Sequence, residues 1–178
     1  MTSAQQLKQL AVAASDPDTA LTNAMELLCQ LLACDRCFLY LRDPDTRQGR
    51  VTHCYSIDIR WADLRGAAWI ESDNIETKDP LMAIAFRTAE PVFVEDIETA
   101  SADVINLDYE RKEFGHRALV HAPIYGDGRL IGILEPCMFE QPREWTEADR
   151  ELVAIAQEAL TPIVLSYLES TAIADPIP

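Results

Sequence analysis

Apolar residues recur at helical spacing near the start of the chain. Leu21, Met25 and Leu28 fall on one helical stripe, and Asp16 stands before this stripe as a capping residue. The pattern predicts an amphipathic helix from Asp16 to about residue 34. A short helical extension is expected before it, over residues 1–15.

A second helical stripe begins after residue 146. Thr146 and Asp149 have the spacing of a capping box, although Asp replaces the usual Glu or Gln. The apolar face that follows consists of Leu152, Ile155, Ala156, Ala159 and Ile163. The pattern predicts a long helix that ends near residue 169, followed by a flexible tail over 170–178. The two terminal helices are expected to belong to one domain, over 16–169.

Alternation of apolar and polar residues with period two predicts two hairpins between these helices. The first covers residues 36–57 and contains the turn signal DPDTRQG. The second joins strands at 117–125 and 129–139 through Gly126-Asp127-Gly128. The segment between the hairpins is predicted to hold two short helices and one short strand, at residues 79–89, 105–115 and 91–96.

This order of elements predicts the α+β class, since strands and helices are grouped rather than strictly alternating. We expect an antiparallel sheet with the two terminal helices packed on one face. The short helices and loops are expected to cover the other face and to form a pocket there. A small ligand would bind in such a pocket between sheet and helices.

The chain of 178 residues carries 30 acidic and 15 basic residues, a net charge of −15. Such a chain is repelled by nucleic acid and by anionic membranes, so neither is expected as a partner. Residues 1–15 do not resemble a signal peptide, and no run approaches the roughly 18 apolar residues of a membrane span. The five cysteines are expected as free thiols, and the location as cytoplasmic.

Three segments resemble GAF domains. They are DRCFLYL at 35–41, AIAFRTAEPVFVEDI at 83–97 and RALVHAPIYGDGRLIGIL at 117–134. The resemblance extends over roughly residues 17–168. PREW at 142–145, followed by an acidic amphipathic helix, is most similar to the GAF domains of phytochromes and cyanobacteriochromes. The resemblance implies the GAF fold and, for that group, a linear tetrapyrrole in the pocket.

The residues that hold the chromophore in that group are replaced here. The attachment Cys and its neighbouring His fall at Asn106 and Leu107, and a second pocket His falls at Cys137. Asn106 offers no thiolate, so a covalent bilin at the usual position is not expected. A noncovalent tetrapyrrole stays open, and the identity of the ligand is unknown.

Glu135 lies in the most apolar strand of the chain. If the hairpin pairs without irregularity, Val120 lies opposite Glu135 and Ala122 opposite Ile133. Alternation, together with the position of Cys137 in the resemblance, then turns Val120, Glu135 and Cys137 toward the pocket and His121 toward the terminal helices. Glu135 is expected to bind a cationic or hydrogen-bond-donating group of a ligand. Alternatively it pairs with an arginine of the chain, or the strand frays at Pro136.

Seven residues are the candidates for lining the ligand pocket: Glu135, Cys137, Val120, Trp69, Phe86, Tyr109 and His116. For two of them a structural alternative stays open. Trp69, like Trp61, could pack under a long loop, and His116 could lie in a surface loop. A zinc site at Cys34 and Cys37 is not favoured, because its remaining ligands, His53 and Cys54, point to opposite faces of a strand.

The function expected from these patterns is binding rather than catalysis. No nucleophile, base and acid stand together in a known arrangement, and an enzyme would depend on Cys137 as a thiolate. We expect a non-enzymatic GAF-type sensory or regulatory module that binds a small ligand. It would act through a homodimer formed by its terminal helices or through a partner protein. The alternative is a degenerate GAF domain that serves only as a dimerisation scaffold.

Overall fold

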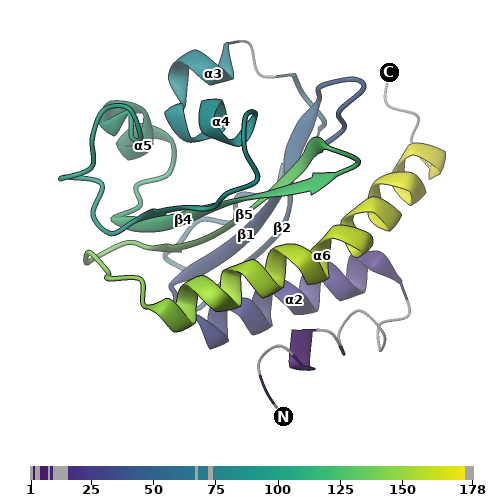
Figure 1. Cartoon of the computed structure of the whole chain (residues 1–178), viewed down its shortest axis with the longest axis horizontal. Coiled ribbons are helices and arrows are strands. Elements are labelled where there is room, and N and C mark those ends of the chain that lie inside the picture. The colour runs from purple at the N-terminus through teal and green to yellow at the C-terminus, as the bar shows by residue number, and fades with distance from the viewer. Residues whose placement is uncertain are drawn as a thin grey trace.

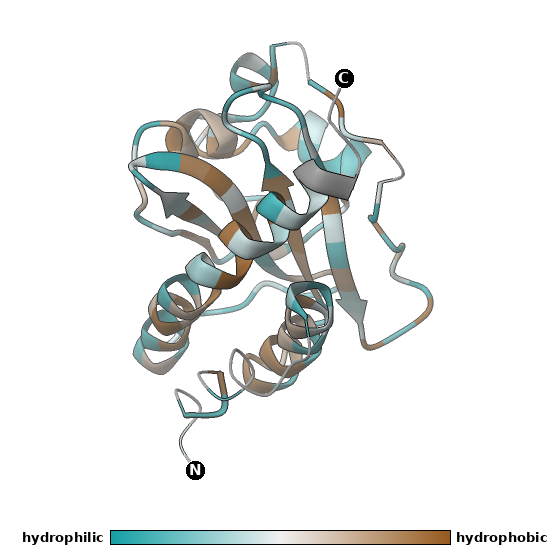
Figure 2. Ribbon diagram, turned by 90° about the vertical axis from the view of Figure 1, so that its right-hand side faces the viewer, coloured by the Kyte–Doolittle hydropathy of each residue, from teal (hydrophilic) through white to brown (hydrophobic). Residues whose placement is uncertain are grey.

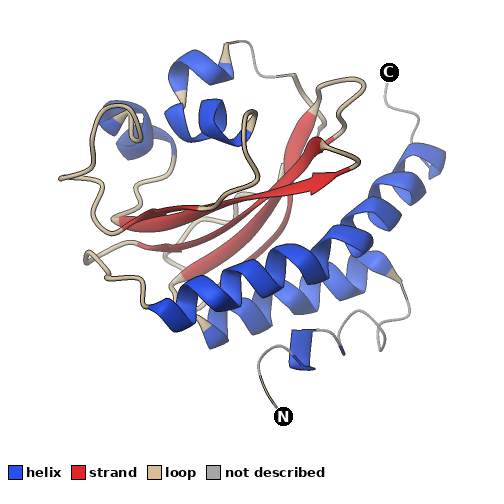
Figure 3. Cartoon of the chain, viewed as in Figure 1, coloured by secondary structure: helices blue, strands red, loops and turns tan. Residues whose placement is uncertain are grey.

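A five-stranded antiparallel sheet separates two layers of helices in the computed structural model (Figures 1 and 3). The structure describes residues 2, 5–7, 9, 16–66, 68–71 and 74–174. The strands are β1 (Arg36–Arg42), β2 (Gly49–Ser56), β3 (Val92–Val94), β4 (Ala118–Gly126) and β5 (Arg129–Met138), in the spatial order β2-β1-β5-β4-β3. The predicted α+β class is confirmed.

The two long helices lie side by side on one face of the sheet, as predicted (Figure 1). They are α2 (Pro17–Leu31) and α6 (Glu147–Ala174). The other face carries three short helices, α3 (Ile75–Lys78), α4 (Pro80–Ala85) and α5 (Leu107–Glu113). The hairpin strands, α4 and α5 fall within or close to the predicted segments, whereas α3 was not predicted.

Side chains cap the long helices where the sequence predicts. The Thr19 backbone N–H donates to Asp16 Oδ1 at 2.9 Å. At α6 the capping box is reciprocal: Thr146 N–H donates to Asp149 Oδ2 at 3.0 Å, and Asp149 N–H donates to Thr146 Oγ1 at 3.2 Å. These bonds satisfy backbone donors that a helix leaves unpaired at its first turn. The Asp149 carboxylate thus serves in place of Glu or Gln.

The predicted domain ends differ in detail from the structure. α6 continues past residue 169 to Ala174, so residues 170–174 of the predicted tail belong to this helix. Residues 175–178 lie outside the described residues. Of the predicted N-terminal extension, residues 5–7 and 9 are helical, and Leu7 is buried in the core. The rest of the segment up to residue 15, apart from Thr2, lies outside the described residues.

The main core lies between the sheet and the long helices. In Figure 2 the strands are largely coloured as hydrophobic, whereas the long helices carry both colours. Leu21, Met25, Leu28 and Ile163 are buried in this core, so these side chains are not available to the homodimer expected through the terminal helices. By length and composition alone α6 passes as a membrane span, but it packs on the sheet and on α2, as core helices do.

A register shift in the second hairpin corrects the predicted pairing. Tyr125 pairs with Leu130 as expected. A shift between Ile124 and Tyr125 then moves every pair farther from the hairpin turn by one residue. Ala122 pairs with Leu134, not with Ile133, and the same register places His121, not Val120, opposite Glu135. Because side chains alternate between faces, the shift exchanges the two faces of β4. His121 therefore turns to the short helices, and Val120 joins the core under α2 and α6.

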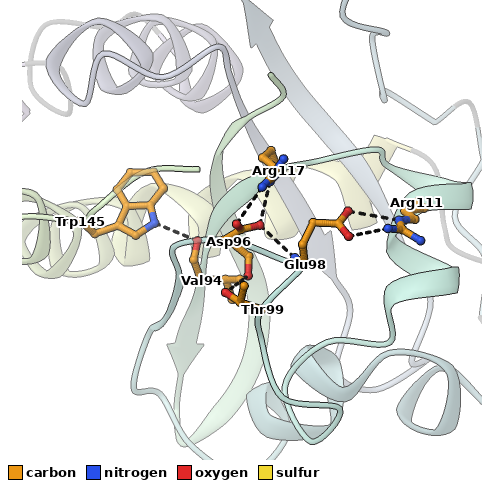
Figure 4. A network of polar contacts seen from close by, with 7 residues as sticks. All are labelled: Val94, Asp96, Glu98, Thr99, Arg111, Arg117 and Trp145. Carbon is orange, nitrogen blue, oxygen red and sulfur yellow. Dashed lines mark hydrogen bonds and ion pairs between the residues drawn. The ribbon is translucent and has the colours of Figure 1, made fainter. Parts of the chain in front are cut away.

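A polar network holds the segment after β3 against α5 (Figure 4). Arg117 donates to both carboxylate oxygens of Asp96, at 2.7 and 2.8 Å, and Arg111 on α5 donates to Glu98 at 3.3 Å. The Trp145 indole N–H donates to a backbone carbonyl of β3 at 3.1 Å. Side chains thus connect the segment after β3 to α5, to the start of β4 and to the start of α6.

The capping box of α6 gives a first test of the fold. Replacing Thr146 by alanine removes the acceptor for the Asp149 N–H and should lower the free energy of unfolding by about 1 kcal/mol. Thr146→Ser keeps the hydroxyl and should stay close to the original protein. Urea unfolding followed by circular dichroism measures both variants, and equal losses in the two would show that the hydroxyl bond is not the cause.

Candidate functional site

A cavity of about 180 Å³ lies between the sheet and the short helices. Its floor comes from two neighbouring strands, with Phe38 and Tyr40 on β1 and Ile133 and Glu135 on β5. The other walls come from β2, β4, the three short helices and Phe114: Val51, Ile75, Asp79, Leu81, Met82, Tyr109, Glu110, Phe114 and His121. The cavity therefore combines aromatic and aliphatic walls with three carboxylates and one imidazole.

Glu135 is bonded to the imidazole that lies opposite it in the hairpin. His121 Nδ1 lies 2.8 Å from Glu135 Oε2, and both side chains are buried. Burial by itself raises the pKa of Glu135. The hydrogen bond to His121 and the influence of the neighbouring His121, His116 and Arg36 side chains outweigh that effect, so the pKa lies below its ordinary value. Glu135 is therefore an ionised carboxylate inside the sheet.

A second imidazole, His116, supports the same carboxylate from behind. Its Nδ1 lies 2.6 Å from Glu110 Oε1 on α5 and 3.5 Å from Glu135 Oε1. The contact with Glu110 is electrostatic, since the two atoms are not aligned for a hydrogen bond. On the other side of the ring, Nε2 lies 2.7 Å from Arg36 Nη2. His116 thus joins β1, β5 and α5.

Two influences oppose each other at His116. Burial lowers its pKa, but the neighbouring Cys137 and Glu110 outweigh burial and raise it to about 10. The guanidinium of Arg36 acts against protonation, because an arginine only donates and Nε2 must accept from it. With this contact in place the imidazole is neutral and holds one proton, on Nδ1. Protonating His116 would require Arg36 to move away.

Arg36 is the buried cation of the site. It is 1% exposed, and Nη1 donates to the Ala62 carbonyl at 2.8 Å. Its guanidinium carbon lies 4.7 Å from the centre of the Phe139 ring, a cation–π distance. The Ala62 contact ties the loop after β2 to the back of the cavity. Arg36 therefore balances charge at Glu135 through His116 rather than by pairing with the carboxylate directly.

The short helices α3, α4 and α5 form the roof of the cavity, opposite the sheet, and polar side chains of this roof line the cavity. Asp79 Oδ1 accepts from the backbone N–H of Leu81 at 2.9 Å and so caps α4. The pKa of Asp79 lies above its ordinary value. Burial is the main cause, His121 opposes it, and Glu135 adds to it. Burial and nearby carboxylates, Asp79 first, raise the pKa of Tyr109 to about 12, so its hydroxyl keeps its proton.

The structure brings together only part of the predicted site. Glu135 and Tyr109 line the cavity, and His116 lies directly behind it, buried rather than in a surface loop. Val120 faces the terminal helices, and Cys137 is buried beside Leu119 with its thiol toward the Arg36 carbonyl. Neither therefore lines the cavity.

The other predicted aromatic residues pack outside the cavity. Trp69 packs against the main core and under the Arg50 guanidinium, and Phe86 lies under Arg42. Trp61 stacks on Phe139 with ring centres 4.0 Å apart. For both tryptophans the structure thus favours packing under the loop over a wall of the ligand pocket.

Three polar residues of the cavity were not among the predicted site residues: His121, Asp79 and Glu110. Asp79 is the first residue of the helix predicted at 79–89, a position typical of a capping residue, and this was the signal available for it. His121 was assigned to the opposite face because of the register shift. Within the described residues no group of His, Cys, Asp or Glu is arranged to hold a metal ion.

Comparison with known proteins gives one family. The sequence model of the GAF domain family matches residues 16–160. No curated protein sequence matches this chain.

Several solved structures share its fold. A GAF domain from an Acinetobacter phosphoenolpyruvate-protein phosphotransferase is 13% identical with a TM-score of 0.69, over 97% of this chain and 93% of that one. The phycoerythrobilin-bound GAF domain of a cyanobacterial phytochrome is 18% identical, with a TM-score of 0.73 over 94% and 98%. Free methionine-R-sulfoxide reductase from Neisseria meningitidis, in complex with its substrate, is 17% identical, with a TM-score of 0.67 over 94% and 89%. At these identities the likeness shows the fold alone.

The lowered pKa of Glu135 gives a pH-dependent prediction. A carboxylate with a lowered pKa stabilises the fold above its ordinary pKa of 4.5, and this contribution is lost as the pH falls through the folded value. Glu135→Gln should therefore lower the free energy of unfolding by about 1–3 kcal/mol near pH 7 and by clearly less below about pH 4. Glu144→Gln, at an exposed position, is the control. Urea unfolding at both pH values decides, and a loss of equal size at the two would contradict an ionised Glu135.

Proposed function

The chain belongs to the GAF domain family, and from this premise we propose that it is a sensory or regulatory module that binds a small ligand between its sheet and α3, α4 and α5. GAF domains are in general modules of this kind. The observation that carries the proposal is the cavity itself. An ionised carboxylate and two further acidic side chains line it. Buried charge of this kind is costly for a fold and is retained mainly where it serves binding.

The cavity also argues against a dimerisation scaffold that has lost its ligand. Such a scaffold gains stability when its cavity fills with apolar side chains, because a void forfeits contacts and a buried charge adds cost. Here Glu135, His121 and Glu110 are all buried and border the cavity. We infer that these groups are retained for a ligand.

The size of the cavity disfavours a noncovalent tetrapyrrole. Pockets for drug-sized ligands measure about 300–1,000 Å³, and this cavity is smaller. The position of the family's attachment cysteine is taken by Asn106, which accepts from the Tyr109 N–H to cap α5 and donates to the Lys78 carbonyl. Asn106 borders a separate surface depression, not the cavity. A colourless ligand with few atoms fits the cavity better.

Binding in the cavity has a direct route to the terminal helices. Glu135 on β5 faces the cavity, while its neighbour Leu134 faces the core under α2 and α6. A ligand that shifts β5 would thereby shift the packing of the long helices, which we propose pass the change to a second copy or to a partner protein. Ile155 and Ala159 of the predicted apolar face of α6 are half-buried, as are Leu165 and Leu168 farther along the helix, and these side chains are available for such contact. A cytoplasmic location stays a prediction.

We propose that the module is not an enzyme, although a reductase shares the fold. An enzyme of this fold using cysteine would need an accessible thiolate. Cys137 is fully buried, and its thiol contacts the Arg36 carbonyl at 3.5 Å.

Thiol labelling tests this part of the proposal. Near pH 7, iodoacetamide should modify the half-buried Cys54 first, and Cys137 only at a rate set by unfolding. Peptide mass spectrometry over time gives the rate at each cysteine, with denatured protein as the reference. Modification of Cys137 in the folded chain as fast as that of Cys54 would reopen an enzymatic role.

Substitutions at Val51, which lines the cavity from β2, test the binding function. Val51→Phe should fill part of the cavity and abolish binding, whereas Val51→Ala at the same position should retain it. Ligand-observed NMR with cationic, neutral and anionic fragments of about 6–12 non-hydrogen atoms measures this, and millimolar affinities are expected. The proposal fails if no fragment binds, or if fragments bind both variants equally.

A further inference from the structure

His121 presents a buried nitrogen without a partner to the cavity. Its side chain is 5% exposed, and its Nδ1 is bonded to Glu135. Nε2 has no hydrogen-bond partner among the described residues. Because Nδ1 donates to the carboxylate, the neutral imidazole keeps a lone pair on Nε2, and this atom accepts hydrogen bonds. A buried acceptor left without a donor is unfavourable, and a ligand N–H group in the cavity would supply that donor.

The charges around this nitrogen select the sign of the ligand. Asp79, Glu110 and Glu135 line the cavity, and Arg36, a permanent cation behind them, is already engaged with Ala62 and His116. With His121 neutral, as the acceptor role of its Nε2 requires, one of the three carboxylates stays uncompensated even when His116 is counted as a second cation. Beside the buried carboxylates of Glu110 and Glu135 an anionic ligand would add to the negative charge, whereas a cation would reduce it. Phosphate-bearing and carboxylate-bearing ligands are therefore disfavoured.

The walls select the body of the ligand. Phe38, Tyr40, Tyr109 and Phe114 surround the cavity from β1 and from the segment around α5. Aromatic rings attract a cation placed over their faces and also bury apolar groups. A cavity of about 150 Å³ holds one benzene molecule. At about 180 Å³, this cavity holds a ring or short chain together with one polar group.

We propose that the cavity binds a small organic ammonium ion. Its N–H groups donate to His121 Nε2 and to the carboxylates of Glu135 and Asp79, and its apolar body lies against the aromatic walls. The inference rests on the proposed function, since it names the chemical class of ligand for the same cavity. Primary amines that carry one ring, or an aliphatic chain of similar volume, are the compounds that meet these conditions.

Three probes of one shape test the charge selection. Benzylammonium, benzyl alcohol and benzoate share a benzene ring and differ in the charge of their polar group. Each is titrated into the whole chain near pH 7 and followed by NMR of the protein. Benzylammonium should bind at least about tenfold more tightly than benzyl alcohol, and benzoate should bind most weakly.

Variants with a matched change of charge locate the effect. Asp79→Asn removes one carboxylate and keeps a good capping residue for α4. It should reduce the preference for benzylammonium over benzyl alcohol by about threefold or more. Glu144→Gln removes a charge at an exposed position outside the cavity and should leave the preference unchanged. Val51→Phe should abolish binding of benzylammonium.

Each outcome separates the ligand class from the proposed function. If benzyl alcohol or benzoate binds as tightly as benzylammonium and Val51→Phe abolishes that binding, the ammonium class is wrong and the ligand-binding function stands. Absence of binding by benzylammonium up to about 10 mM also overturns the class, and the fragment experiment at Val51 then decides the function separately. If benzylammonium binds Val51→Phe unchanged, the site lies elsewhere and the inference fails.

Discussion

A carboxylate buried in the middle of the sheet sets the conditions for everything around it. An uncompensated charge in such a place costs several kcal/mol, so groups that stabilise it must come from the neighbouring elements. His121 reaches Glu135 from β4, and His116 approaches it from the segment before that strand. Arg36 on β1 completes the arrangement through His116. The polar groups in the floor and behind the cavity are thus arranged around the charge of Glu135 and stabilise it.

The same cluster connects the two layers on this side of the molecule. Glu110 belongs to α5 and contacts His116, so a helix of the roof takes part in the balance of charge within the sheet. Asp79 at the start of α4 is also sensitive to Glu135 and His121. A group that enters the cavity and changes the charge at Glu135 therefore acts on the strands and on the roof together.

Much of the fold could be predicted from the sequence, because helical stripes, caps and turn residues are local signals. The capping box at Thr146 and Asp149 and the hairpin turn after Tyr125 are examples. The cavity could be predicted only in part. Pro123 and Gly126 flank the register shift and Gly132 pairs with Ile124, but none of these residues fixes the register by itself, so strict alternation exchanged Val120 and His121. Arg36 meets His116 across 80 positions of sequence, a contact that no local pattern contains.

The roof and the sheet are held by different kinds of bond, and this has a consequence for motion. The strands share ladders of backbone hydrogen bonds, whereas α5 is fixed through side chains, namely Asn106 to Lys78, Arg111 to Glu98 and Glu110 to His116. Side-chain contacts of this kind break in local opening events that leave the sheet intact. Amide hydrogens of α5 should thus exchange with solvent far sooner than those of β5, and the chain has a route for a ligand to reach the cavity without global unfolding.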